Sequence, residues 1–266
     1  MEKEENDPMR PSKCRVEKAD IFIVKEIQNV VSIQFRDQFF EHIGNLDARN
    51  FVFRQLNQIK QSDSVRALIL NFSLETADTA HYKNFFLDEA RTKRKLGIYR
   101  YGNVINQLIM TIIGLGKIVI FICHGELISL FLNLGLACHY RIASATTVFH
   151  NAYLELGMLP IGGGPFFLGR LLGTPKALEI LLLNDQITAD RAHQLGLVER
   201  VVPPADLEKT ALEIAQRFAL YPPRSLKGLI RLLNYSRRDL DEYLRFENHE
   251  FISILEQTAF ADRGAA

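Results

Sequence analysis

Short apolar runs that suit buried strands alternate along the chain with longer stretches of helical spacing. Two neighbouring runs near the amino end, Ile21–Lys25 and Val30–Phe35, are rich in β-branched and aromatic residues, which is typical of strands. Val65–Asn71 and Lys117–Cys123 are mostly apolar, the pattern of strands buried on both faces. Further short strands are expected at Tyr140–Ile142 and Thr147–Phe149.

Helical spacing covers most of the remaining sequence. In Ala48–Ile59 the apolar residues recur on one helical face, and Leu127–Cys138 is apolar nearly all round. Thr188 suits the N-cap of a helix Ala189–Leu195, and Asp190 in its first turn suits the helix dipole. The other expected helices are Tyr82–Lys95, Val104–Ile113, Pro165–Leu172, Lys176–Leu183, Leu207–Leu220, Arg224–Tyr235 and Leu240–Gln257. Strands that alternate with helices, followed by a helical tail, predict an α/β fold.

Composition and charge exclude several classes of protein. The 266 residues, 47% hydrophobic, suffice for one large domain with a well-buried core. Lys and Arg number 32 against 31 Asp and Glu, so the global basic field of a nucleic-acid binder is absent. No apolar run reaches the roughly 18 residues that span a bilayer, and the charged amino terminus is no secretory signal. Three cysteines without CxxC spacing, Cys14, Cys123 and Cys138, are typical of reduced thiols. We therefore expect a soluble cytoplasmic protein that binds neither nucleic acid nor membrane.

The strand-to-helix turn at His124-Gly125-Glu126 is the first candidate for chemistry. A helix amino terminus offers unpaired N–H groups and a positive dipole end, which can hold an oxyanion or a phosphate. His124, His139 and His150 show no metal-ligand spacing, so no metal site is expected. Gly162-Gly163-Gly164 precedes a helix but lacks the GK[ST] of a phosphate loop.

Several segments in the second half of the chain carry a family resemblance. They are Ala137–Ser144, Leu156–Gly164, Leu171–Glu179, Ile187–Ala189 with Ala192–Val198, and Val201–Pro203. Together they resemble the crotonase superfamily, the enoyl-CoA hydratase/isomerase family. The match is specific from about Lys117 to Pro203 and weaker from Ile21 to Asn71, and Pro222-Pro223-Arg224 resembles the start of the family's carboxy-terminal helical region.

The resemblance implies a crotonase-like (ClpP/crotonase) fold, a spiral of ββα units with a helical trimerisation region. We expect a disordered segment at residues 1–13, a spiral core at 14–203 and a helical region at 204–266. The family association further implies a trimer or a dimer of trimers. It also implies a site for an acyl thioester of coenzyme A, which enters as part of the substrate, with no other cofactor. Two backbone N–H groups there would polarise the thioester carbonyl.

Aligned on the family, the chain departs from it at the amino end of the helix after Glu126. The family's Gly-Gly-Gly falls on Ser129-Leu130-Phe131, so the oxyanion donor would be the backbone N–H of Leu130. The added Leu and Phe side chains are expected to narrow the space, since glycine permits close approach of a ligand. Gly125, Ser129, Gly162 and Gly163 are the other expected substrate-binding residues of this region, Gly162 and Gly163 in the turn that lines the acyl pocket.

Both of the family's catalytic glutamates fall on other residues. The first falls on Asn133, which cannot act as a general base near neutral pH. Two interpretations stay open for it: a satisfied core amide, bonded for instance to Ser129, or an amide that orients water or substrate. The second glutamate falls on Tyr153, a packing aromatic or else a phenol that donates to an enolate, and the nearest carboxylate is Glu155.

The second oxyanion donor belongs to the loop after Val65–Asn71, where the family's Phe-x-x-Gly-x-Asp motif is absent. An ungapped count places the donor at Ala80, with Lys83 at a position that meets a CoA phosphate, and Ala77-Asp78 is a gapped alternative. The carboxyl end at Ala266 lacks the apolar and basic stretch that commonly helps to cover the nucleotide in the family.

Three functional hypotheses follow from the resemblance and the departures. The first is an enoyl-CoA hydratase/isomerase-like protein that binds an acyl-CoA thioester, with Asn133, Tyr153, Leu130 and Ala80 in the catalytic positions. Loss of a general base usually removes about 10²–10⁴ in rate per group, which argues against ordinary hydration. The second is a base-independent acyl-CoA decarboxylase, since loss of CO₂ yields the enolate without a base. The third is a non-catalytic crotonase-fold protein for oligomeric binding or assembly.

Overall fold

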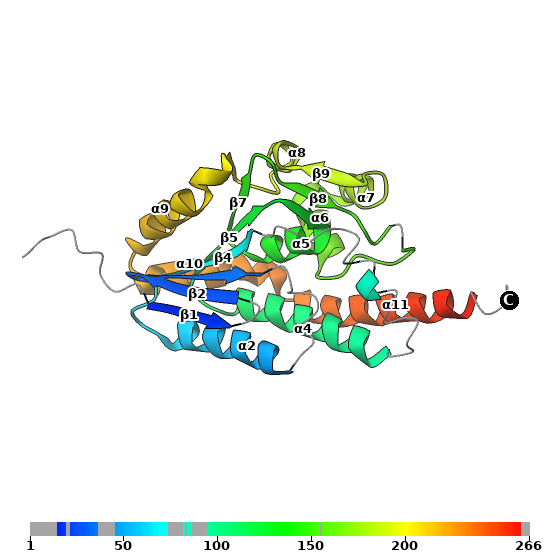
Figure 1. Cartoon of the computed structure of the whole chain (residues 1–266), viewed down its shortest axis with the longest axis horizontal. Helices are drawn as coiled ribbons and strands as arrows, with labels where there is room; N and C mark the ends of the chain where they lie inside the picture. Colours follow the sequence, from blue (N-terminus) through cyan, green and yellow to red (C-terminus); the bar gives the residue numbers. More distant parts are fainter. Residues whose placement is uncertain are drawn as a thin grey trace, which may run out of the picture.

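A seven-stranded sheet organises the protein and is flanked by helices (Figure 1). The computed structural model describes residues 15–19, 22–36, 46–73, 82, 84–86, 95–154 and 156–261. Several positions named in the sequence analysis lie outside the described residues. They are residues 1–13, where disorder is expected, and Cys14, Ala77, Asp78, Ala80, Lys83 and Glu155. The fold within these ranges is the expected α/β arrangement with carboxy-terminal helices.

The large sheet has the strand order β1-β2-β3-β4-β5-β7-β10. Strands β1 to β3 pair antiparallel, and each pair from β3 to β10 is parallel. A small sheet has the order β6-β8-β9. The bounds are β1 Arg15–Ala19, β2 Phe22–Ile27, β3 Val30–Phe35, β4 Ala67–Ser73, β5 Ile118–His124, β6 Glu126–Ile128, β7 Tyr140–Ser144, β8 Val148–His150, β9 Gln186–Thr188 and β10 Arg200–Val202.

Helices cover both faces of the large sheet. Helices α2 and α4 lie below β1 and β2 in Figure 1, α9 lies on the other side, and α11 runs beside α4 and contacts it. The bounds are α2 Leu46–Gln61, α4 Lys95–Ile113, α5 Ser129–Ala137, α6 Gly164–Leu172, α7 Thr174–Leu182, α8 Ala189–Gln194, α9 Leu207–Ala219, α10 Pro223–Asn234 and α11 Leu240–Ala261, with 3₁₀ turns η1 Pro204–Asp206 and η2 Tyr235–Arg237.

The central strands are apolar on both faces because each face has its own core. Alternate side chains of β5, such as Val119 and Phe121, enter the core shared with α4 and α5. Their neighbours Ile120 and Ile122 enter the core shared with α9. Since strand side chains alternate between faces, continuous apolar runs are required wherever helices cover both sides. The interpretation of the runs at β4 and β5 is confirmed.

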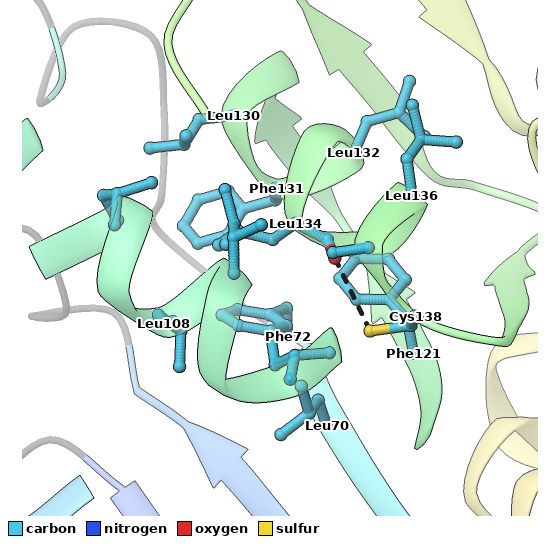
Figure 2. Close-up of a cluster of buried hydrophobic side chains, with 14 of the residues drawn as sticks. Leu70, Phe72, Leu108, Phe121, Leu130, Phe131, Leu132, Leu134, Leu136 and Cys138 are labelled. Atoms are coloured by element: carbon cyan, nitrogen blue, oxygen red, sulfur yellow. Dashed lines mark hydrogen bonds between the residues drawn. The ribbon is translucent and has the colours of Figure 1, made fainter. Parts of the chain in front are cut away.

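Helix α5 is buried along its whole length. Figure 2 shows Phe131 of α5 pointing into the core toward Phe72, and the two ring centroids are 5.1 Å apart. Gly135 lies over Phe121, where a Cβ would come within 2.9 Å of the ring. The Cys138 thiol donates to the Leu134 carbonyl at 3.5 Å. This packing explains why the helix is apolar nearly all round.

The structure extends the expected elements in several places. The hydroxyl of Thr188 accepts the Arg191 N–H, so the expected N-cap of α8 is confirmed. The sequence pattern missed β1, β6, β9 and β10; β6, β9 and β10 have three residues each, too few to show a period of two. Glu126–Ile128 therefore precedes α5 as a strand, and the helix begins at Ser129 instead of Leu127.

Within the described ranges, no helix is long and apolar enough to cross a membrane.

Candidate functional site

The amino end of α5 follows β5 through a tight turn. Gly125 has a positive φ of 91°, a conformation that suits glycine, and β6 then leads into the helix. Ile128 occupies the N-cap and makes no side-chain capping bond. Because the first N–H groups of a helix lack intrahelical partners, the Leu130 N–H belongs to a set that can face a ligand.

A small cavity of about 10 Å³ lies beside this helix end. It brings together four residues that the sequence placed in the site, Ser129, Leu130, Asn133 and Tyr153. The remaining lining residues are Tyr82, Ile128, Ala152, Pro160 and Ile161. A cavity of this size is close to the limit of about 10–15 Å³ that admits one water molecule. The site residues therefore converge, with little open space between them.

Leu130 is the side chain that narrows the cavity. It is 4% exposed and abuts Gly162, where a Cβ would lie 2.8 Å from Leu130 Cδ1. Gly162 also has a φ of 83°, so both its conformation and its surroundings suit glycine. Phe131 was expected to narrow the same space, and this expectation is wrong, because its ring packs in the core against Phe72. Successive helical residues point in different directions, which separates Phe131 from the cavity.

Asn133 is a buried amide with a backbone partner. Its Nδ2 donates to the Ile161 carbonyl at 2.9 Å, and its side chain is 3% exposed. The amide also lies against Gly164, where a Cβ would be 2.8 Å from Nδ2. The partner is thus Ile161 rather than the Ser129 considered from the sequence. Asn133 fixes the turn that precedes α6.

The phenol of Tyr153 is directed to a carbonyl group. Its hydroxyl donates to the Leu181 carbonyl at 3.0 Å, and its side chain is 3% exposed. Burial raises the pKa of Tyr153, so the phenol stays neutral at physiological pH. The single phenolic proton is therefore already used in holding α7 against residues 151–154.

Glu247 of α11 is a site residue that the sequence interpretation missed. Both of its carboxylate oxygens accept the Gly163 N–H, at 3.1 and 3.0 Å. Burial raises the pKa of Glu247 to about 7, although hydrogen bonds from Gly163, Gly162 and Tyr243 oppose the shift. The spacing of Leu240, Leu244, Glu247 and Phe251 places this carboxylate on the buried stripe of α11, which is the signal that could have found it.

The turn Ile161–Gly164 is therefore held from two sides. Asn133 binds its first carbonyl from α5, and Glu247 binds its third N–H from α11. Gly162 and Gly163 have φ values of 83° and 75°, and their N–H groups both turn toward the carboxylate. Consecutive N–H groups of this kind form an anion-binding nest. Gly163 thus binds a carboxylate of the chain itself and does not line the small cavity.

The other predicted positions lie away from the cavity. The carbonyl of Gly125 accepts the Val148 N–H at 3.2 Å, and His124 Nδ1 pairs with Ser144 Oγ at 2.8 Å. His139 accepts the Val119 N–H, and burial lowers the pKa of His139 to about 4. In the part of the chain that is described, His, Cys, Asp and Glu form no group suited to a metal ion.

The sequence profile described as Enoyl-CoA hydratase/isomerase matches residues 29–264 of this chain. The chain belongs to the enoyl-CoA hydratase/isomerase family. A short-chain-enoyl-CoA hydratase of Clostridium acetobutylicum is 29% identical over 202 residues, which cover 74% of each chain. The fatty acid oxidation complex subunit alpha of Shewanella amazonensis is 33% identical over 163 residues, 60% of this chain. The match covers only 23% of the length of that Shewanella protein.

Solved structures of the family confirm the fold. The enoyl-CoA hydratase of Bacillus halodurans superposes with a TM-score of 0.73 over 95% of this chain and 98% of that chain, at 17% identity. The enoyl-CoA hydratase of Mycobacterium avium subsp. paratuberculosis gives a TM-score of 0.71 over 94% and 100%, at 18% identity. The crotonase fold expected from the sequence is thus shown, with its two sheets and carboxy-terminal helices.

Proposed function

We propose that this member of the enoyl-CoA hydratase/isomerase family binds a short acyl-CoA thioester at the amino end of α5 and does not hydrate enoyl-CoA. The observation that carries the proposal is the convergence of Ser129, Leu130, Asn133 and Tyr153 at an uncapped helix end. The cavity between them holds about one water molecule, so a thioester enters only when the Leu130 side chain moves aside. The name of the Clostridium relative, a short-chain-enoyl-CoA hydratase, supports acyl-CoA as the class of ligand.

The thioester carbonyl is the group that this helix end is suited to bind. An N–H in the first turn polarises a carbonyl and stabilises the negative charge that develops on it. The Leu130 N–H supplies one such donor in our proposal. Ala80, as a second donor, and Lys83, as a partner of a CoA phosphate, stay predictions from the sequence. The fit of Leu130 against Gly162 favours a short acyl group.

The absence of hydration follows from the two side chains at the family's glutamate positions. Asn133 has no acid or base chemistry near neutral pH, and its Nδ2 donates to Ile161. Tyr153 donates its proton to Leu181. The carboxylate of Glu247 is bound to the Gly163 N–H. Hydration needs groups that move a proton and activate water, and none of these three is placed to do so.

One reaction is compatible with an oxyanion donor alone. In a malonyl-type thioester the bond to the carboxylate carbon breaks, CO₂ leaves, and the electron pair moves into the thioester to form an enolate. The Leu130 N–H would stabilise the enolate oxygen, and a proton from water would complete the product. The step requires no general base, so Asn133 is compatible with it.

We expect the purified protein to give no measurable hydration of crotonyl-CoA. Loss of two acid–base groups, at about 10²–10⁴ per group, is expected to lower turnover by about 10⁴ or more. The reaction is followed by the loss of absorbance of the conjugated thioester. The assay is run on the wild type and on Asn133→Glu, with a family hydratase as the positive control. Turnover that Tyr153→Phe abolishes would overturn this assignment of the site.

An assembly function is the second candidate, and the surface of α10 offers an interface for it. Leu229, Leu232 and Leu233 are 53%, 75% and 60% exposed, and Tyr235 just beyond the helix is 67% exposed. Apolar side chains gathered in this way are typical of an interface between protein chains. We propose that this face mediates the self-association, as a trimer or dimer of trimers, that the family resemblance implies.

Leu232→Glu is expected to convert the oligomer to a monomer. The side chain is largely exposed in the single chain, so folding is retained, while a charge in an apolar interface is costly. Light scattering coupled to size-exclusion chromatography measures the mass. Lys209→Glu on α9, another exposed position, is the control that should keep the assembly. A monomeric wild-type protein would refute the assembly proposal.

A further inference from the structure

A second cavity, of about 580 Å³, opens at the amino ends of β4 and β5. Five cationic side chains and one carboxylate line it: Lys60, Arg66, Lys117, Arg224, Lys227 and Asp63. They come from the end of α2, the approaches to β4 and β5, and the start of α10. We call this cavity the basic groove. Its volume lies within the range of about 300–1,000 Å³ typical of small-molecule sites.

The five cationic side chains of the basic groove are not paired with carboxylates within the described residues. Among the described residues none of the five forms an ion pair, and Asp63 alone opposes them. Lys117 Nζ donates to the Ser62 carbonyl at 2.7 Å, and Arg66 donates to the carbonyls of Ala219 and Tyr221 at 3.2 and 2.6 Å. Carbonyl acceptors hold these side chains in place without neutralising them.

The backbone brings the like charges close together. Burial lowers the pKa of Lys117, and the neighbouring cations Arg66 and Lys227 lower it further against the effect of Asp63. Gly116 has a φ of 71°, and the side chain of Lys227 lies across it, 3.5 Å from where a Cβ would be. Gathered cations repel each other, so an anion that enters between them is stabilised by several charges at once.

Apolar side chains form the rest of the wall, including Leu115, Pro222 and Leu226. A ligand that fits therefore carries several negative charges and an uncharged body. Arginine and lysine together are the usual protein partners of phosphate groups. We propose that the basic groove binds a small organic phosphate that carries at least two phosphate groups, such as a nucleoside diphosphate.

The basic groove is separate from the acyl-CoA site proposed above. The groove residues precede β4 and β5, whereas Ser129 and Leu130 follow β5. The seven residues of β5 span about 20 Å at roughly 3.3 Å per residue, so the two sites lie at opposite ends of the parallel strands. Binding in the groove is thus independent of whether the chain binds a thioester.

Titration calorimetry with inorganic pyrophosphate and with ADP tests the proposal on the full chain. We expect both to bind to the wild type, with ADP the tighter because of the apolar wall. Lys227→Glu and Arg224→Glu, both exposed positions, should each weaken binding at least tenfold, while Lys209→Glu should leave it unchanged.

Two outcomes would overturn the proposal. No heat with either probe at millimolar concentration would show that the groove does not bind phosphates. An equal loss from Lys209→Glu would reveal non-specific attraction by net charge. Retained binding of pyrophosphate without any binding of acetyl-CoA would refute only the function proposed above.

Discussion

Replacing Glu199 by alanine is expected to lower the free energy of unfolding by about 3 kcal/mol, the lower end of the cost of breaking a buried ion pair from one side, because the Glu199 side chain is 29% exposed. Arg141 of β7 is 7% exposed and forms an ion pair with Glu199. The second carboxylate oxygen accepts the Arg141 backbone N–H at 2.6 Å, and Arg141 Nη1 donates to the Cys138 carbonyl at 3.2 Å. Removal of the carboxylate leaves a buried cation without its counter-ion.

The exposed pair Arg170–Asp239 provides the matched control. Its oxygen and nitrogen atoms are 2.8 Å apart, but both side chains are more than 40% exposed. Water and salt screen such a pair, so Asp239→Ala should change the urea midpoint much less than Glu199→Ala does. Urea unfolding at one protein concentration measures both variants. Equal small effects would show that the Arg141–Glu199 pair contributes no more than a surface contact.

Glu247→Gln is expected to raise the free energy of unfolding at pH 8 by up to about 3 kcal/mol while changing little at pH 5. The pKa of Glu247 is raised to about 7 from the ordinary 4.5, chiefly by burial. The folded protein therefore holds a proton that the unfolded chain releases between these values. Stability falls as pH rises from about 4.5 to about 7, and a neutral amide removes this loss.

Unfolding measured at pH 5, 6, 7 and 8 tests the expectation. Glu242→Gln, at an exposed position on the same helix, is the control and should keep the wild-type pH dependence. In the described residues Glu247 has no ion-pair partner, and its facing groups are the Gly162 and Gly163 N–H and the Tyr243 hydroxyl. A Glu247→Gln variant whose stability still declines above pH 5 as in the wild type would contradict the buried-carboxylate account.

The sequence predicted the central sheet better than it predicted the small one. The strands β4 and β5 could be recognised from the sequence because helices cover both faces, which makes most of their positions apolar. The three residues of β6 and of β9 carry no periodicity, and their pairing depends on β8, far along the chain from β9. Strands of this length are specified by tertiary contacts rather than by local pattern.

The site was partly predictable for a similar reason. The alignment on the family placed Leu130 and Asn133 in the expected site, and both line the cavity. The predicted direction of the Phe131 side chain was wrong. Adjacent residues of a helix point in different directions, so being next to Leu130 in the sequence does not bring Phe131 to the ligand. The sequence analysis did not predict Glu247 as a site residue, because its partners, Gly162 and Gly163, are more than 80 residues away along the chain.

Calorimetry of acetyl-CoA with the wild type, Leu130→Ala and Leu130→Pro tests the central claim most directly. Both variants remove the leucine side chain, but only proline removes the backbone N–H, and proline is tolerated in the first turn of a helix. We predict that the wild type and Leu130→Ala bind acetyl-CoA and that Leu130→Pro loses at least tenfold in affinity. Absence of binding to the wild type at millimolar ligand, or equal affinity of the two variants, would contradict a thioester site at the amino end of α5.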